Sequence, residues 1–275
     1  MTGGDAQQIG NYTLVTPGLD RRLAMDAFAA IPKGHPMVGL LELDVTDAMA
    51  VIDALQRSGE RVSLFAFVVR SIAVALSEHP ELNQVRHGKR LLRFDDVDVS
   101  VPVEVEADAA RVPREVVIRR AQQRSVREIY AELEAARARH EASGALGAED
   151  RWARRTMRAV GWLPAFARTA FVRMIVRNGF RIKARAGTTL VTSVGKFAAI
   201  PGFSFTFSTG PRAAVFVVGS VVEKPWLYGG QVCARKVLAL SVIVDHDLVD
   251  GAPAARFAHR LQALIESAHG LSPAS

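Results

Sequence analysis

The sequence has only one cysteine and no long hydrophobic run. Cys233 cannot form an internal disulfide and has no second thiol for a metal cluster, and its apolar, strand-like surroundings favour a buried, inert thiol. Every stretch of eighteen residues contains charge, and residues 1–20 lack the basic and apolar regions of a signal peptide. We therefore expect a cytoplasmic protein with no membrane span, no secretory signal, no metal site and no catalytic cysteine.

Acidic residues are absent from one long basic stretch. Residues 151–186 contain no Asp or Glu but ten basic side chains, namely Arg151, Arg154, Arg155, Arg158, Arg168, Arg173, Arg177, Arg181, Lys183 and Arg185. The whole chain carries a formal net charge of +7, so subtracting these ten leaves −3 for the rest. Because the positive charge is local and the body is mildly acidic, we expect no nucleic-acid partner.

Helix-capping and helix-breaking residues, together with the spacing of apolar residues, predict the first elements of the chain. Residues 1–20 are polar with interspersed Gly and Pro, which is typical of an N-terminal arm. Thr46 is a suitable N-cap for a helix that ends at Gly59. The next helix, over residues 63–79, is apolar on all sides, so it should be buried and should end before Pro80.

The later sequence alternates between strand and helix patterns. Period-two alternation predicts a half-buried strand over residues 97–105 with a neighbour at 114–120, followed by an amphipathic helix over 125–143. Runs rich in Val, Thr and Phe then predict four strands, at residues 187–195, 203–209, 213–223 and 237–245. A final helix begins near Pro253 and places four apolar side chains on one face, Phe257, Leu261, Leu264 and Ile265.

The chain has no internal repeat, and no Gly/Ser-rich linker flanks the basic stretch. These features favour one α+β domain, a mixed sheet flanked by helices, over residues 21–275. A basic helical insertion at about 145–186 interrupts the domain, and Gly161 with Pro164 should split it into two helices.

His246 is placed where catalytic side chains often lie. It follows the apolar run VLALSVIV, so it stands at the end of a buried strand, and Asp250 and Gly251 come just before the last helix. Taken by themselves, His246 is more simply a histidine satisfied at a strand end and Asp250 an N-cap, so the spacing alone is a weak catalytic signal.

The segment DHDLVDGAPAARF resembles the H-x-x-x-D-G signature of dihydrolipoamide acyltransferases, the core components of 2-oxo acid dehydrogenase complexes, and of chloramphenicol acetyltransferases. Further matches follow in order: the helix ending in PELN, the strand DVDVSVPVEVE, the helix SVREIYAELEAAR, the segment GTTLVTSVGKF and the strand pair PRAAVFVVGSVVEKP. The resemblance covers roughly residues 37–143 and 187–268. It implies a chloramphenicol-acetyltransferase-like fold and a homotrimer or larger assembly of trimers, with active sites at subunit interfaces.

The resemblance also implies roles for single residues. His246 is similar to the general base that takes a thiol proton from coenzyme A or a dihydrolipoyl group, a task suited to a pKa near neutrality. Thr192 stands where the family has a hydroxyl that donates to the oxyanion, and Ser193 beside it can serve instead. Asp250 resembles a structural carboxylate that pairs with an arginine, which Arg21 or Arg22 can supply.

One departure and one absence limit the resemblance. Asp247 replaces the arginine that commonly follows the histidine, which puts the usual partner or substrate contacts in doubt. No lipoyl site and no room for a lipoyl domain are found before residue 20, so we expect the acyl group to arrive on coenzyme A or on an acyl-carrier or lipoyl domain in trans.

The basic insertion has several interpretations. Its apolar side chains can pack on the protein itself or on a neighbouring subunit with the arginines in solvent, which is the simplest one. The insertion can also lie on an anionic membrane, dock on an acidic carrier domain or contact coenzyme A phosphates.

We therefore expect a coenzyme-A-dependent acyltransferase acting on a thiol or small-molecule acceptor. One alternative is a non-catalytic trimeric protein that uses the same fold for assembly or for docking to a membrane or partner. Another is the same histidine acting as a base on a carrier-bound biosynthetic intermediate.

Overall fold

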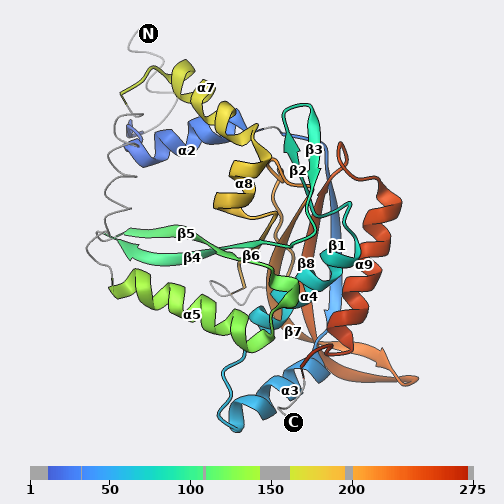
Figure 1. The fold of residues 1–275 in the computed structure, drawn as a ribbon. Helices are drawn as coiled ribbons and strands as arrows, with labels where there is room; N and C mark the ends of the chain where they lie inside the picture. Colours follow the sequence, from blue (N-terminus) through green and yellow to red (C-terminus); the bar gives the residue numbers. More distant parts are fainter. Residues whose placement is uncertain (1–11, 32, 108–109, 143–161, 196–200, 272–275) are drawn as a thin grey trace.

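A six-stranded mixed sheet organises the protein (Figure 1). The computed structural model describes residues 12–31, 33–107, 110–142, 162–195 and 201–271. The strands lie in the order β1-β8-β7-β6-β4-β5, where β6 is parallel to both of its neighbours and the other pairs are antiparallel. Their bounds are β1 Pro36–Asp44, β4 Val99–Ala107, β5 Ala110–Ile118, β6 Thr189–Ser193, β7 Ala214–Tyr228 and β8 Gln231–Asp245. The expected α+β class with a mixed sheet is confirmed.

Helices pack on one face of this sheet and enclose the main core (Figure 1). They are α3 (Thr46–Arg57), α4 (Leu64–Glu78), α5 (Val126–Ala142) and α9 (Gly251–Glu266). As expected, α4 is buried on most of its surface, and the Ser63 hydroxyl caps it by accepting from the Ala66 amide at 3.2 Å. The four apolar residues expected on one face of the last helix are all buried.

The opposite face of the sheet carries a smaller apolar cluster. Buried side chains of β7 and β8 form it, and the half-buried Leu190 and Val194 of the β6 segment pack against them. Among the described residues, no helix layer comparable to the one on the other side covers this face (Figure 1). Val38 and Leu40 of the edge strand β1 remain exposed.

Three local predictions differ from the structure. Residues 203–209 do not form a strand, because local bonds compete with sheet pairing: the Ser208 amide donates to Thr206 Oγ1 and the Gly210 amide to Ser208 Oγ. Thr46 is the first residue of α3 rather than its cap. Cys233 is half-buried instead of buried. In addition, the structure contains a separate hairpin that was not predicted, β2 (Gln84–His87) with β3 (Arg90–Arg93).

The described part of the basic insertion forms α7 (Ala165–Val176) and α8 (Gly179–Ala186). The break between them is at Asn178, whose side chain caps α8, and α7 begins directly after Pro164, its N-cap residue. Gly161 and the rest of 143–161 lie outside the described residues, as does the arm before residue 12. Residues 12–18 of the arm are exposed and lead into α2 (Leu19–Ala30). No helix in the described ranges has both the length and the apolar character needed to cross a membrane.

Ion pairs at two places tie the insertion to the body. Arg168 of α7 forms a 2.5 Å ion pair with Asp26 of α2. Lys183 of α8 and Arg119 both contact the buried Asp98 carboxylate, at 3.0 Å and 2.8 Å. Burial alone would raise the pKa of Asp98, but hydrogen bonds from the Arg120 amide, Arg119 and Lys183 outweigh it and lower that pKa.

Candidate functional site

His246 immediately follows β8, at the end of the buried run Val237–Asp245, as the sequence predicts. Its amide donates to the His35 carbonyl at 2.9 Å, which fixes the backbone. Its side chain is 52% exposed, and Nδ1 lies 4.0 Å from Asp250 Oδ1, beyond hydrogen-bond range. The imidazole is therefore accessible to a second molecule.

A charged cluster holds the strand end that carries His246. Arg86 Nη2 lies 2.8 Å from Asp245 Oδ2 and 2.9 Å from Asp247 Oδ2. His35 Nδ1 lies 2.7 Å from Asp247 Oδ1, and the His35 amide donates to Asp245 Oδ1 at 3.2 Å. The residues on either side of His246 are thus both held by Arg86 and His35.

The cluster changes the pKa of its members. The hydrogen bond from His35, assisted by the Arg86 guanidinium, holds the pKa of Asp247 below its ordinary value. Partial burial by itself lowers the pKa of Arg86, but Asp245 and Asp247 outweigh it and raise that pKa. Both Asp247 and Arg86 are therefore charged at neutral pH.

Backbone geometry supports the same cluster. Gly34 has φ +60°, and a Cβ there would come within 2.7 Å of the Asp245 carboxylate oxygens. From the other side, Gln84 Nε2 donates to the Leu248 carbonyl at 2.9 Å. The segment after β8 is thus held by a glycine turn on one side and by strand β2 on the other.

The Asp250 carboxylate is exposed at the start of α9 within one chain. It is the N-cap residue of α9 but makes no side-chain cap, and its side chain is 88% exposed. Arg21 and Arg22 lie exposed on α2, and no ion pair among the described residues joins either of them to Asp250. The arginine that contacts the carboxylates of this segment is Arg86.

Thr192 and Ser193 point to opposite faces of the sheet. Ser193 lines a pocket on the helix side, while Thr192 is paired with Val217 and shares the face of the smaller apolar cluster. Strand β4 pairs with β6 only through Thr189 and Leu190, so the sheet opens between these strands beside Thr192. Thr192 is half-buried at that opening.

The structure does not bring Thr192 and His246 together within one chain. Thr192 is level with Val217, and Val217 is level with Ser241 of β8. His246 comes five residues after Ser241, and a strand rises about 3.3 Å per residue, so the two levels are roughly 16 Å apart along the strands. Neither side chain spans that distance.

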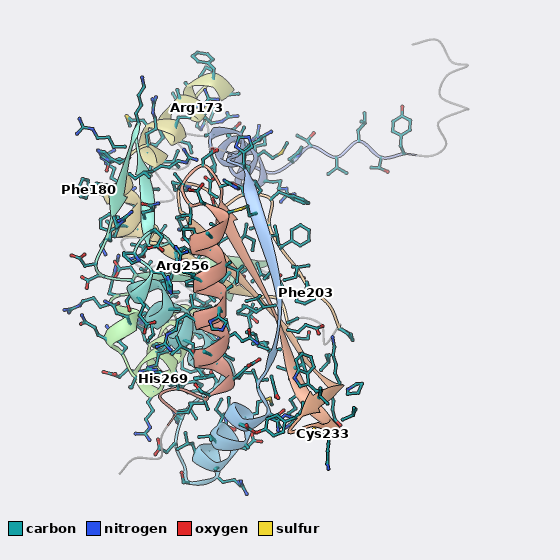
Figure 2. All side chains as sticks on the ribbon, turned by 90° about the vertical axis from the view of Figure 1, so that its right-hand side faces the viewer. Arg173, Phe180, Phe203, Cys233, Arg256 and His269 are labelled. Atoms are coloured by element: carbon teal, nitrogen blue, oxygen red, sulfur yellow. The ribbon has the colours of Figure 1, made fainter. Side chains whose placement is uncertain are left out.

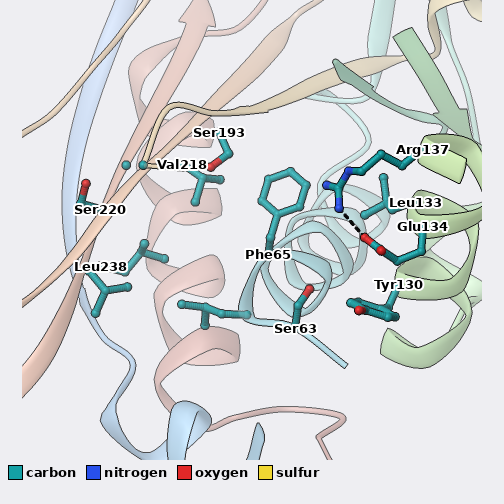
Figure 3. A pocket seen from close by; sticks show the side chains of 14 residues that line it. Ser63, Phe65, Tyr130, Leu133, Glu134, Arg137, Ser193, Val218, Ser220 and Leu238 are labelled. Carbon is teal, nitrogen blue, oxygen red and sulfur yellow. Dashed lines mark hydrogen bonds and ion pairs between the residues drawn. The ribbon is translucent and has the colours of Figure 1, made fainter. Parts of the chain in front are cut away.

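A pocket of about 520 Å³ lies beside Ser193, between the sheet and two helices (Figure 3). Its walls come from the first residues of α4, one side of α5, and the middle of β7 where the strand has a bulge. Figure 3 shows Arg137 paired with Glu134 on the α5 wall, facing Ser193 and Val218. The lining residues are Ser63, Leu64, Phe65, Tyr130, Leu133, Glu134, Arg137, Ser193, Gly195, Val218, Gly219, Ser220, Val221 and Leu238.

Sequence reasoning missed Arg86, His35 and Arg137. Arg86 and Asp245 are 159 residues apart, and no local pattern links them. Arg137 was indistinguishable from the solvated arginines of an amphipathic helix. The signal that was available is Asp245, which ends the apolar run of β8, because a buried carboxylate requires a cationic partner.

A metal-binding cluster is not found in the described ranges: no three or more His, Cys, Asp or Glu side chains there are grouped to hold an ion. The pocket and the His246 segment instead present a base, hydroxyls and arginines.

The family model for the 2-oxoacid dehydrogenases acyltransferase (catalytic domain) matches residues 27–151 and 183–272. A lipoamide acyltransferase component of the branched-chain alpha-keto acid dehydrogenase complex from Bacillus subtilis (strain 168) is 25% identical over 234 residues, which is 83% of this chain and 46% of that protein. The component with the same description from Pseudomonas aeruginosa is 27% identical over 272 residues, 96% of this chain and 54% of that protein. The chain thus spans about half the length of these curated relatives.

Solved structures share the fold over nearly the whole chain. A probable dihydrolipoamide acetyltransferase from Listeria monocytogenes superposes with a TM-score of 0.69 at 21% identity, covering 97% of this chain and 99% of that one. The dihydrolipoamide acetyltransferase of Azotobacter vinelandii gives 0.67 at 21% identity, covering 96% and 95%. At this identity the likeness establishes the fold.

Proposed function

Because the chain belongs to the family of 2-oxoacid dehydrogenase acyltransferase catalytic domains, we propose that it transfers an acyl group between coenzyme A and an acceptor, with His246 as general base. The observation that carries this is the position of His246, which is exposed at the end of a buried strand and held by a charged cluster on both sides. The Azotobacter vinelandii structure concerns the role of a serine, and of a histidine and an asparagine four residues apart, in that enzyme's catalytic mechanism. The same spacing separates His246 from Asp250.

The proposed reaction is a proton transfer followed by acyl transfer. The neutral imidazole of His246 takes the proton from the acceptor thiol, and the thiolate attacks the thioester carbonyl carbon of the donor. The carbonyl oxygen becomes an oxyanion, to which the Thr192 hydroxyl donates. When the carbon–sulfur bond of the donor breaks, the departing thiolate takes the proton back from the imidazolium.

We propose that a second copy of the chain completes the site. His246 and Thr192 are too far apart within one chain, and His246 is open to solvent, where an oxyanion gains little from one hydroxyl. The sheet face that carries Thr192 has exposed apolar side chains at its edge, Val38 and Leu40, as an interface requires. A homotrimer in which His246 of each subunit faces Thr192 of the next satisfies these features, and one solved relative is the cubic core of a pyruvate dehydrogenase complex.

The pocket beside Ser193 fits the elongated, partly apolar arm of coenzyme A. Tyr130, Leu133 and Val218 offer apolar contact, Ser63 and Ser193 offer hydroxyls, and Arg137 offers a cation for phosphate. Ser193 lines this pocket and directly follows Thr192 in the chain, and strand β6 is not paired with β4 at either residue. We propose that acyl coenzyme A enters here and that its thioester reaches the opposite face at Thr192.

The acceptor is proposed to be a thiol on a dihydrolipoyl or carrier domain in trans, or a small molecule. The curated relatives are named as lipoamide acyltransferase components, but Asp247 occupies the position after the histidine in this chain and is held by Arg86 and His35. Family membership favours a transferase over a non-catalytic assembly protein on this fold. A cytoplasmic location stays a prediction.

The test is acyl transfer from acetyl or branched-chain acyl coenzyme A to dihydrolipoamide. We expect His246→Ala to lower kcat by about 100-fold or more with an unchanged assembly and melting temperature. His259→Ala, which removes an exposed imidazole from α9, is the matched control and should keep full activity. Full activity of His246→Ala would refute the proposal.

A further inference from the structure

Helix α7 presents an unusual surface for a water-facing helix. None of its twelve residues is buried, and Phe166 is 78% exposed. Trp162, just before the helix, is 91% exposed. A helix of this length is marginal in water unless a packed face stabilises it, so further covering of α7 would stabilise it.

Only one side of α7 is used inside the molecule. Arg168, Val172 and Ile175 are partly buried, and Arg168 pairs with Asp26 of α2. At 100° per residue these three side chains share one side of the helix. The opposite side, which we call the outer face of α7, consists of Phe166, Ala170, Arg173, Met174 and Arg177, and all five are exposed.

The outer face of α7 is part of the positively charged surface of the insertion. Arg173 and Arg177 on this face, with Arg181 and Arg185 on α8, are exposed and form no ion pair within the described residues. No Asp or Glu occurs between 151 and 186 to neutralise them. Figure 2 places Arg173 at the end of the molecule opposite to Cys233 on the β7–β8 hairpin.

This surface is not explained by the proposed chemistry. The family match stops at residue 151 and resumes at 183, so α7 lies outside the part shared with the acyltransferase catalytic domains. Arg173 and Arg177 do not line the pocket beside Ser193 either.

We propose that the outer face of α7 docks the protein on an anionic lipid bilayer. Trp162, Phe166 and Met174 enter the boundary between headgroups and acyl chains, and the arginines between them extend to lipid phosphates. Apolar and cationic side chains alternate on one face here, which matches a headgroup layer better than a purely acidic protein surface. A second copy meeting this face with its own α7 would bring arginines against arginines.

The experiment is flotation of the full chain with vesicles. Phosphatidylcholine vesicles containing phosphatidylglycerol should bind the protein, and pure phosphatidylcholine vesicles should bind it at least tenfold less. Binding should weaken from 0.1 M to 1 M salt, where the screening length falls from about 10 Å to about 3 Å. Tryptophan fluorescence should shift to the blue on binding. If this shift disappears in Trp162→Phe, the Trp162 indole lies in the lipid interface.

Charge reversal tests whether lipid binding depends on the arginines of this face or only on the net charge of the protein. Arg173→Glu with Arg177→Glu should weaken binding by at least about 30-fold, since each basic residue near the surface contributes to affinity. The matched control reverses Arg57 of α3 and Arg256 of α9, two exposed arginines on other elements, and α3 lies at the far end of the molecule from α7 (Figure 1). The control should lose less than about threefold, because charges beyond a screening length contribute little.

Four outcomes would overturn the proposal. The first three are equal binding to neutral and anionic vesicles, an equal loss in the control variant, and retention by an acidic carrier domain without vesicle binding. Trp162 emission that is already blue-shifted in the lipid-free assembly would assign the face to a second copy and would also overturn it. Acyl transfer of the Arg173→Glu, Arg177→Glu variant should equal that of the wild type in solution, so this result is independent of the proposed function.

Discussion

Arg86 Nη2 lies 2.8 Å from Asp245 Oδ2, and this ion pair joins strand β2 to the end of β8. The Asp245 side chain is only 2% exposed, and Arg86 is the cation that compensates for its burial. The same guanidinium reaches Asp247 at 2.9 Å. Arg86 therefore positions the residues on both sides of His246 without touching the imidazole in any described contact.

Replacing Arg86 tests that positioning role. We expect Arg86→Ala to lower the free energy of unfolding by about 3 kcal/mol, because Asp245 is left buried without a cation. The proposed transferase activity should fall in kcat more than in KM, since the base is displaced rather than the substrate pocket. Urea denaturation and steady-state kinetics measure both effects, with Arg57→Ala as the control, and unchanged stability would show that Asp245 does not need Arg86.

Thr192 and Ser193 make separable predictions. Thr192→Val keeps the shape but removes the hydroxyl, and we expect kcat to fall by about 100-fold. Ser193→Ala should change kcat by less than about threefold, because this hydroxyl lines the pocket on the other face of the sheet. Kinetics with a saturating acceptor distinguish the two, and the reverse order of effects would assign the oxyanion contact to Ser193.

The sequence predicted the elements that local patterns specify. The alternation and apolar runs of β7, β8 and β4 placed His246 at a strand end, and the helix spacing identified the buried residues of α9. The sequence did not predict features that depend on partners distant in the chain or on the face of the sheet to which a strand residue points. The contact of Arg86 with Asp245 has no local signal, the faces of Thr192 and Ser193 require the register with Val217 and Val218, and residues 203–209 have strand composition but bond locally.

Mixed assemblies test whether the site is shared between copies. His246→Ala and Thr192→Val chains should each be nearly inactive alone. If His246 of one subunit faces Thr192 of the next, random co-assembly leaves about a quarter of the sites intact. Chains co-expressed in equal amounts and purified without selecting for mixed assemblies should therefore regain about a quarter of wild-type activity, whereas separately purified proteins mixed without exchange serve as the control. Activity no higher than the parents' would place both residues in one chain or neither in the site.

The buried Asp98 carboxylate should make the free energy of unfolding depend on pH. Its pKa is lowered in the folded protein from an ordinary value of 3.8, so its contribution is complete above that value and is lost as the pH falls through the folded-state pKa. Asp98→Asn should cost about 2 kcal/mol of unfolding free energy at pH 7, and the difference should shrink below about pH 4. Denaturation across pH 3 to 7 measures this, and Asp53→Asn, an exposed carboxylate on α3, should show no such trend.

Arg137 tests the proposed coenzyme A pocket. It lines the cavity beside Ser193 and pairs with Glu134, so Arg137→Ala removes a phosphate partner and leaves a carboxylate unpaired there. We expect KM for acyl coenzyme A to rise about tenfold with kcat within about twofold, because binding and not the reacting centre is affected. Arg137→Lys should recover part of the loss, and added salt should raise the wild-type KM towards that of Arg137→Ala, since salt screens a phosphate contact. An unchanged KM in Arg137→Ala would place coenzyme A elsewhere while leaving the role of His246 intact.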